Sequence, residues 1–307
     1  MSKIRLVLYF KLLRAPFFTA SVVPVLVGTS LAYAVSDVFN LPIFVLALFG
    51  TMALHGGANI ANDYFDHKSG NDWVNENTTP FSGGSRLIQN KQLSPTSVLI
   101  ASWVCLLVGG ILGIGLLIIT KSIFVLMLGV IGLVGGYFYT ATPIKLGYRT
   151  AGELAIAFLF GLLPVYGAYY VQTMRFDFVP VVPGMIVALL IFLVILANEF
   201  ADAKADKAVN KKTIVVQFGT VAAIRVYKIV LLIICLLGVV NIFTVDYITG
   251  AIVLLIILAI FSLVCLKALD AEKLNSKGYT TLSRTAILMH LVSGLAFAGA
   301  LLISKIV

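Results

Sequence analysis

Nine long apolar runs divide the chain, and short polar segments separate them. A hydrocarbon core of about 30 Å requires about 20 apolar residues per helical crossing, and each run is close to that length. Prolines and glycines inside the runs, such as Pro24 and Gly167, are tolerated in membrane helices and favour close packing. The pattern predicts an all-α polytopic membrane protein, one membrane domain over residues 1–307, with about nine transmembrane helices at residues 17–35, 41–61, 96–119, 122–140, 152–172, 180–198, 221–243, 247–267 and 286–304.

Composition supports a membrane protein. The chain is 60% hydrophobic and only 11% charged, which leaves less polar surface than a soluble protein of 307 residues needs. The first apolar run lacks a clear cleavage site and is followed by further runs, so we do not interpret it as a signal peptide. We therefore expect the whole chain to be embedded in a lipid bilayer.

The distribution of basic residues predicts the orientation. The net charge of +9 is compatible with nucleic-acid binding, but the position of the charges argues against it. With Met1 in the cytoplasm, nine spans place 19 of the 22 lysines and arginines on the cytoplasmic side, because only Lys121, Arg175 and Lys305 fall outside. This is a strong positive-inside bias. It predicts a multi-pass protein of the cell membrane with a cytoplasmic N-terminus and no nucleic-acid partner.

An acidic motif occurs twice, each time at the end of an apolar run. Residues 61–68 read Ala-Asn-Asp-Tyr-Phe-Asp-His-Lys, and residues 197–204 read Ala-Asn-Glu-Phe-Ala-Asp-Ala-Lys. The two copies are four spans apart, so both face the same side of the membrane. The repeat is therefore parallel, whereas many secondary transporters contain inverted repeats. We expect a first motif at residues 62–72 and a second at 198–206, both on cytoplasmic loops.

The chemistry of the two motifs suggests magnesium. Asn62 and Asp66 are four residues apart, as are Asn198, Asp202 and Asp206, so each set lies on one face if its helix continues. Like charges so close together require a cation, and ligands that are all oxygen suit Mg²⁺. Because Mg²⁺ commonly takes one or two carboxylates plus phosphate oxygens, the two faces together suggest a diphosphate bridged to the protein.

The chain resembles the UbiA superfamily of membrane prenyltransferases over most of its length. Residues 62–66 and 198–206 resemble the two Asp-rich motifs of the superfamily. The segments 68–72, 79–86, 139–145 and 211–213 look most like the menaquinone-type branch, the 1,4-dihydroxy-2-naphthoate prenyltransferases. One departure concerns a third acid, which in the 4-hydroxybenzoate branch follows four residues after the position of Asp66. Here that position is Gly70 and the next acid is Asp72, which leaves Asp72 an uncertain ligand.

This resemblance implies a helical bundle with a central cavity and a reaction that needs Mg²⁺. A polyprenyl diphosphate would lose its diphosphate, and the allylic carbon would bond to an electron-rich aromatic ring. In the naphthoate branch the ring also releases its carboxylate as CO₂. Asp66, Asp202, Lys145 and Tyr139 are the candidate catalytic residues. The candidate metal ligands, direct or through water, are Asn62, Asp63, Asp66, Asn198, Asp202 and Asp206.

Other polar residues are candidates for substrate contact. Lys68, Arg86, Lys145 and Arg149 could hold diphosphate, although loop charges are commonly only solvated. Tyr139 could face the allylic cation, position the acceptor, or belong to an interfacial aromatic belt.

His55 shares a helical face with Asn62, and both are candidates to bind the acceptor; a buried, hydrogen-bonded role for His55 is the alternative. Residues 82–85 could form an anion-binding nest or a flexible loop. Glu153 is spaced to pair with Arg149 on a helix.

Two alternative functions remain open at this stage. The acceptor could instead be 4-hydroxybenzoate, homogentisate or a glycerol-phosphate lipid. A cation-coupled transporter would also use acids within its membrane domain, but it should place them near the midplane rather than at the ends of spans. The sequence carries no signal for the length of the isoprenoid or for the oligomeric state.

Overall fold

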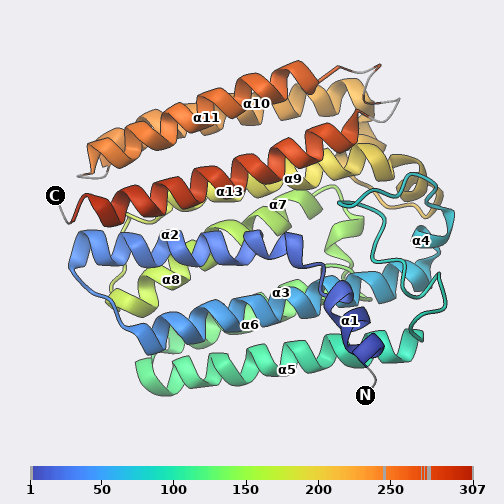
Figure 1. Ribbon diagram of the computed structural model, residues 1–307, viewed down its shortest axis with the longest axis horizontal. Helices are drawn as coiled ribbons and strands as arrows, with labels where there is room; N and C mark the ends of the chain where they lie inside the picture. The colour runs from blue at the N-terminus through green and yellow to red at the C-terminus, as the bar shows by residue number, and fades with distance from the viewer. Residues whose placement is uncertain (1–2, 245–246, 271, 273, 275–277, 306–307) are drawn as a thin grey trace.

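The computed structural model describes residues 3–244, 247–270, 272, 274 and 278–305. Over these residues the protein is helical and contains no strand. Its long helices run side by side along one axis, so that their ends gather at two opposite faces (Figure 1). Lys273 and Lys277, which the charge argument places among the cytoplasmic residues, lie outside the described residues.

The predicted spans are confirmed. Eight helical segments are long and apolar enough to cross a membrane, and α6 is a shorter apolar helix of 16 residues. One crossing is composite, because α7, a π-helical turn (η3) and α8 follow one another without a break. The segments are α2 (Thr19–Ser36), α3 (Leu41–Ser69), α5 (Pro95–Thr120), α6 (Ile123–Phe138), α7 (Gly152–Ala157), η3 (Phe158–Leu162), α8 (Leu163–Thr173), α9 (Val181–Ala208), α10 (Ile214–Thr244), α11 (Ile248–Ala268) and α13 (Tyr279–Ile303).

Local sequence explains where the helices that carry the motifs begin and end. Asn40 caps the start of α3 by accepting a hydrogen bond from the Ile43 amide at 3.1 Å. The helix ends at Gly70, whose φ of 86° is the left-handed conformation that glycine adopts readily. The short helix α4 (Asn71–Val74) begins directly afterwards. The sharp turn at Gly70 therefore places α4 beside the end of α3.

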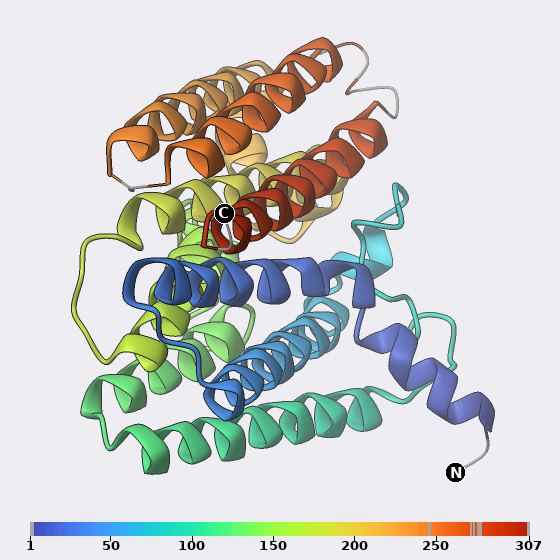
Figure 2. The same cartoon turned by 60° about the vertical axis from the view of Figure 1, so that its left-hand side comes forward.

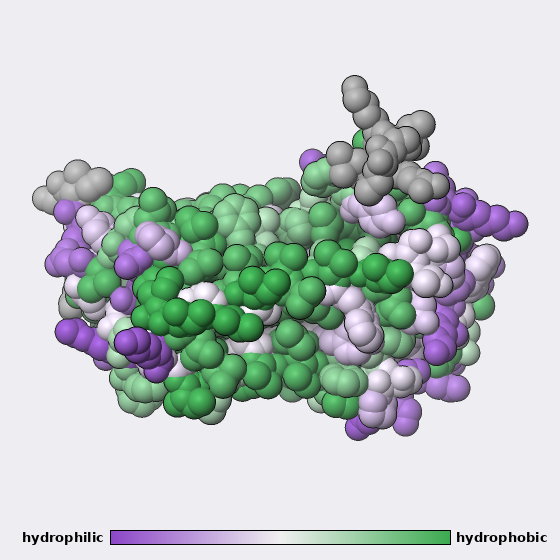
Figure 3. Space-filling model, turned by 90° about the horizontal axis from the view of Figure 1, so that it is seen from below, coloured by the Kyte–Doolittle hydropathy of each residue, from purple (hydrophilic) through white to green (hydrophobic). Residues whose placement is uncertain are grey.

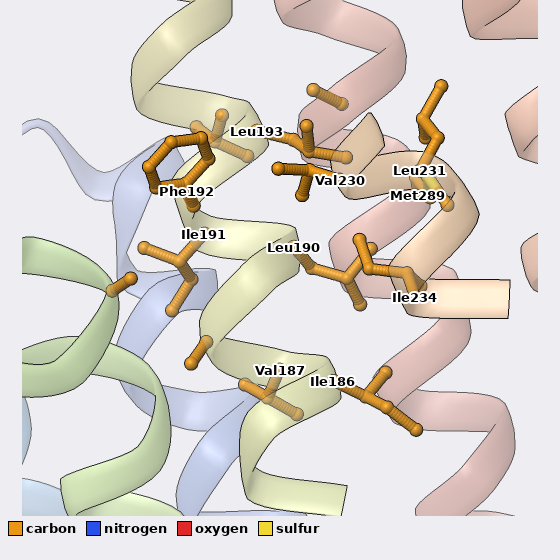
Figure 4. Packing of buried hydrophobic residues seen from close by; sticks show 14 of the residues in the cluster. Ile186, Val187, Leu190, Ile191, Phe192, Leu193, Val230, Leu231, Ile234 and Met289 are labelled. Carbon is orange, nitrogen blue, oxygen red and sulfur yellow. The ribbon is translucent and has the colours of Figure 1, made fainter. Parts of the chain in front are cut away.

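The core lies around α9, which has a buried face toward α10 and α13. Figure 4 shows Leu190 and Leu193 of α9 with Ile234 of α10 and Met289 of α13, and all four are almost fully buried. Close helix contact elsewhere depends on small residues. A β-carbon at Gly28 would lie 2.2 Å from the Val165 carbonyl oxygen, so α2 can approach α8 only because residue 28 has no side chain.

The surface has an apolar middle and polar ends. Figure 3 shows hydrophobic residues across the centre of the molecule and hydrophilic residues at both extremities. The outer face of α5 carries exposed Trp103, Leu107, Ile111 and Ile118, as a helix facing lipid would. The short N-terminal helix α1 (Lys3–Leu12) and α4 lie at one end, and the C-terminus lies at the other (Figures 1 and 2).

Candidate active site

One face of α3 and one face of α9 line a cavity of about 170 Å³. Helix α3 contributes His55, Asn59, Asn62 and Asp66, which are spaced four, three and four residues apart. Helix α9 contributes Asn198, Glu199, Asp202 and Asp206. We expected the motifs on loops, but residues 62–69 and 198–206 are helical, so the spacing of four residues does produce a common face.

The short helix α4 connects the two motifs. Asn71 donates a hydrogen bond from Nδ2 to Asp206 Oδ1 at 2.8 Å. Asn75, one turn further along, donates from Nδ2 to Asp202 Oδ1 at 2.7 Å. Because α4 follows α3 directly through Gly70, the chain that carries the first motif also fixes the orientation of the carboxylates of the second.

A lysine lies between the motifs. Lys211 Nζ is 3.3 Å from Asp206 Oδ1 and 3.9 Å from Asp66 Oδ2. Burial lowers the pKa of Lys211, but the Asp206 and Asp66 carboxylates more than offset it and hold that pKa well above its ordinary value. The ammonium group is therefore charged at neutral pH and pairs with one acid from each motif.

Tyr148 supports Asp66 from the loop between α6 and α7. Its hydroxyl donates to Asp66 Oδ1 at 2.8 Å and lies 2.7 Å from Ser69 Oγ. Burial and the nearby Asp66 carboxylate raise the pKa of Tyr148, so the hydroxyl keeps its proton and remains a donor. The ammonium groups of Lys145 and Lys211 lie 4.8 and 5.5 Å from the centre of its ring.

The glycine-rich segment 82–85 covers two further acids. The Ser85 amide donates to both oxygens of Asp63 at 3.2 Å, and Gln89 donates to Asp72 Oδ2 at 3.1 Å. A β-carbon at Gly84 would lie 2.8 Å from Asp72 Oδ2. Burial, followed by the charges of Asp66 and Asp63, raises the pKa of Asp72 to about 8. Asp72, the ambiguous acid of the sequence, therefore belongs to the same cluster of acidic residues.

The candidates for acceptor contact also line the cavity. His55 hydrogen-bonds through Nδ1 to Ser21 Oγ at 2.7 Å, and Asn62 donates to Asp66 Oδ2 at 3.1 Å. Tyr139 lines the same cavity, with its ring against Gly147.

The four basic candidates lie outside the cavity lining. Lys145 contacts the Tyr148 ring, and Arg86 donates to the Asp72 carbonyl oxygen. Lys68 and Arg149 are exposed, and Arg149 donates from Nε to the Ile144 carbonyl oxygen. The expected pair of Glu153 with Arg149 is wrong. Glu153 is buried and accepts a hydrogen bond from the Ile214 amide at the start of α10 instead.

Sequence reasoning missed five residues of the site. Lys211 was visible only as part of a segment that resembles the family. Asn71 and Asn75 have the same four-residue spacing as the motif, and that spacing could have identified them. Tyr148 and Arg14 carried no local signal, although Arg14 lines the cavity and donates to the Phe81 carbonyl oxygen at 3.3 Å.

Comparison with known proteins identifies the family. The sequence model of the UbiA prenyltransferase family matches residues 21–278. The chain belongs to this family. It is 32% identical over 187 residues to a 1,4-dihydroxy-2-naphthoate octaprenyltransferase of Mycobacterium leprae, a match that covers 61% of each chain. It is 28% identical over 214 residues to a 2-carboxy-1,4-naphthoquinone phytyltransferase of Synechocystis, covering 69% of this chain and 66% of the relative. The chain thus matches about two thirds or less of the length of these curated relatives.

A solved structure shares the UbiA fold. The UbiA homolog from Archaeoglobus fulgidus bound to DMAPP and Mg²⁺ superimposes with a TM-score of 0.71. The match covers 95% of this chain and 99% of that one, with 15% sequence identity. At that identity the likeness shows the fold alone, and it extends over nearly the whole chain.

The oxygen donors in this UbiA family member fit magnesium. Within the described part of the chain, no three His, Cys, Asp or Glu side chains form a ready metal cluster. The donors instead form two sets, on α3 with α4 and on α9, and Asn198 Oδ1 is buried without a protein partner. Such divided sets suit Mg²⁺, which takes few protein ligands and completes its shell with substrate oxygens or water.

A second, apolar cavity adjoins the first. It has a volume of about 350 Å³ and lies among α3, α5, α6 and α8. His55, Gly136 and Phe160 line both cavities. The cavity that holds the acidic motifs therefore borders a more apolar one inside the helical bundle.

Proposed function

We propose that this chain is a membrane prenyltransferase that transfers a polyprenyl group from a polyprenyl diphosphate to 1,4-dihydroxy-2-naphthoate, a step of menaquinone biosynthesis. The observation that carries the proposal is the meeting of the two acidic motifs in one cavity. Asp66 of the first motif and Asp206 of the second share Lys211, and α4 binds the first motif to the second.

The adjoining cavities match an amphiphilic substrate. The diphosphate suits the cavity that holds the acidic motifs and Lys211, and an isoprenoid chain suits the apolar cavity that begins at Phe160. Two relatives in the family act on naphthoate-type rings according to their names, and the Archaeoglobus homolog binds DMAPP and Mg²⁺. These likenesses support both the type of reaction and the choice of acceptor.

The side chains of the site can help to stabilise the negative charge that develops on the departing diphosphate. When bound, Mg²⁺ would supply positive charge to the departing diphosphate. Asn62, Asp66, Asn198, Asp202 and Asp206 would hold it, with Asp63 and Asp72 close by. Lys211 adds a fixed positive charge beside the leaving group.

The half-buried ring of Tyr139 lines the cavity, where its π-electrons can stabilise the allylic carbon as the C–O bond breaks. Bond formation to the aromatic ring then displaces the ring carboxylate as CO₂. The apolar wall of the cavity limits the access of water to the reacting carbon.

We propose that the site faces the cytoplasm in the cell membrane. The motifs, α1 and α4 lie at one end of the bundle, and Lys121, Arg175 and Lys305 follow helices that end at the other. The excess of basic residues at the end that carries the site is the pattern of cytoplasmic segments.

A transfer assay tests the function. The purified protein in lipid nanodiscs is incubated with a labelled polyprenyl diphosphate, Mg²⁺ and one acceptor at a time. We expect a prenylated naphthalene product, released CO₂, and loss of both on chelation of the metal. Turnover of 4-hydroxybenzoate, homogentisate or a glycerol-phosphate lipid without turnover of the naphthoate would reject the acceptor. Ion-driven uptake in proteoliposomes that survives Asp66→Ala and Asp202→Ala would indicate a transporter instead.

A further inference from the structure

Several buried polar atoms around the cavity have no partner within the protein. They belong to Asn59, Glu153, Asn198, Glu199 and His290, and all five residues line the cavity. A buried polar atom without a hydrogen bond costs about 1–3 kcal/mol, and folded proteins contain few of them. Their concentration around a single cavity indicates that a bound molecule supplies the missing hydrogen bonds.

Glu153 and Glu199 form a pair of acids in the wall of this cavity. Glu153 is 1% exposed and Glu199 is 6% exposed, and their carboxyl groups lie beside each other. Glu153 uses Oε1 to accept the Ile214 amide hydrogen bond at 2.7 Å, which fixes its orientation. Apart from the contact between the two carboxyl groups, Oε2 of Glu153 and Oε2 of Glu199 have no partner. The pair therefore keeps lone pairs that can accept a hydrogen bond from a ligand in the cavity.

The diphosphate is the wrong ligand for this pair. Diphosphate oxygens are hydrogen-bond acceptors and cannot satisfy the acceptor oxygens of the pair, and Lys211 pairs with Asp66 and Asp206 rather than with either glutamate. A carboxylate offers only acceptors, so its natural ligand is a neutral group that donates a hydrogen bond. A phenolic hydroxyl is such a group, and the other substrate in the proposed reaction carries two of them.

The position of the pair also suits an aromatic ring. Glu199 lies about one helical turn from Asp202, so a ring held there is about 5 Å further into the bundle than the acids of the second motif. Ile156, Phe160 and Ile195 line the same cavity and offer apolar surface for the faces of the ring. Asn59 Nδ2, an unpartnered donor on α3, can meet an acceptor oxygen of the same ligand.

We propose that Glu153 and Glu199 form the acceptor subsite, where their free carboxyl oxygens accept hydrogen bonds from a ring hydroxyl of the aromatic substrate. The proposal rests on the function proposed above and assigns a place within the cavity to its second substrate. It selects hydroxylated rings, because a ring that lacks the hydroxyl leaves both buried oxygens unsatisfied.

Binding of two analogues tests the subsite without turnover. The probes are 1-hydroxy-2-naphthoate and 2-naphthoate, which differ by one hydroxyl, and they are titrated into the full-length protein in nanodiscs without polyprenyl diphosphate. We expect the unmodified protein to bind the hydroxylated analogue about tenfold more tightly. Glu153→Gln keeps an oxygen for the Ile214 amide, and Glu199→Leu removes the acceptor altogether. Both should reduce that preference to about twofold or less.

Glu76→Gln is the matched control, because Glu76 is exposed and pairs with Lys204 away from the cavity. This control should keep the full preference, and thermal unfolding of each variant checks that it is folded. In turnover, the variants should raise KM for the acceptor and leave KM for the polyprenyl diphosphate unchanged.

Two results would overturn the subsite. One is an unmodified protein that does not distinguish the analogues, and the other is a preference that survives both substitutions. A protein that transfers prenyl groups but gives either result refutes only the subsite. A protein that transfers none refutes the proposed function.

Discussion

Lys211 is the side chain on which the two acidic motifs meet. Its ammonium group contacts Asp206 at 3.3 Å and Asp66 at 3.9 Å, and its side chain is 16% exposed. A single charge in this position reduces the repulsion between acids on two separate helices. It also lies where the proposed diphosphate would enter, so one residue can serve both the folded site and the substrate.

Replacing Lys211 with methionine should reduce kcat/KM for the polyprenyl diphosphate by at least about 100-fold, because a fixed charge beside the leaving group is lost. Lys212→Met is the matched control, since Lys212 is exposed and contacts Tyr148 only through its backbone amide. Steady-state kinetics with both variants measure the difference. Equal losses in the two variants would show that Lys211 has no special role.

The residues of the site differ in how far the sequence could predict them. Asn62, Asp66, Asn198, Asp202 and Asp206 were accessible because helical spacing places residues of one helix on a common face. Lys211 and Tyr148 reach Asp66 from connecting segments, and their positions depend on how helices distant in sequence pack together. No periodicity encodes such contacts. Glu153 shows the converse. Its spacing allows an ion pair with Arg149, but its carboxyl group instead accepts a hydrogen bond from the Ile214 amide, which has no partner within α10.

At the scale of elements, the segment from Gly70 to Ser85 determines the shape of the acidic site. Gly70 turns the chain into α4, and Gly84 brings the covering loop against Asp72 and Asp63. Both glycines have positive φ, 86° at Gly70 and 71° at Gly84. They differ in their surroundings, because a β-carbon would meet nothing within 4 Å at Gly70 but would meet the Asp72 carboxylate at Gly84.

This difference gives a prediction for two alanine substitutions. Each should lower stability by about 1–2 kcal/mol through left-handed backbone strain. Only Gly84→Ala should also raise the Mg²⁺ concentration for half-maximal activity, by about tenfold, because the new methyl group displaces Asp72. Thermal unfolding and Mg²⁺ titration of both variants separate the effects. A Mg²⁺ requirement that rises equally in Gly70→Ala would contradict the role of the loop.

The membrane helices were largely predictable from the sequence, because a continuous apolar run of about 20 residues can cross a bilayer only as a helix or within a closed barrel. The length of α3 and α9 beyond the apolar runs was harder to judge. Residues 62–69 and 199–208 carry charged side chains beyond the apolar runs, yet they are helical. Tyr148 holds the Asp66 carboxylate, and Asn71 and Asn75 hold those of Asp206 and Asp202. The sequence suggested this extension only through the four-residue spacing of its acids.

For the whole molecule, the distribution of basic residues and the direction of the helices both place the two motifs at the same end of the bundle. The nine apolar helices found among the described residues alternate in direction, so the helix ends that carry the motifs lie together. Lys121 follows α5 at the opposite end, where Lys305 pairs with Asp37. The bundle therefore has one strongly basic end with the site and one weakly charged end.

Cysteine labelling tests this orientation. Cys105, Cys235 and Cys265 are first replaced by alanine, and a single cysteine is then placed at exposed Lys68 or exposed Lys121. In spheroplasts, a membrane-impermeant maleimide should label Lys121→Cys directly and Lys68→Cys only after permeabilisation, as the proposed cytoplasmic position of the basic end requires. The reverse pattern would place the site on the outer face.

The internal partners of the acids bear on how a metal ion arrives. Asp66, Asp202 and Asp206 already have Tyr148, Asn75, Asn71 and Lys211 as partners. A divalent ion that reaches these carboxylates must compete with those partners, so its binding free energy is a difference between two sets of contacts. Diphosphate changes that difference, because its oxygens can take over the released lysine. On the proposed function, metal and diphosphate should therefore bind together more favourably than either does alone, because each replaces a partner that the other displaces.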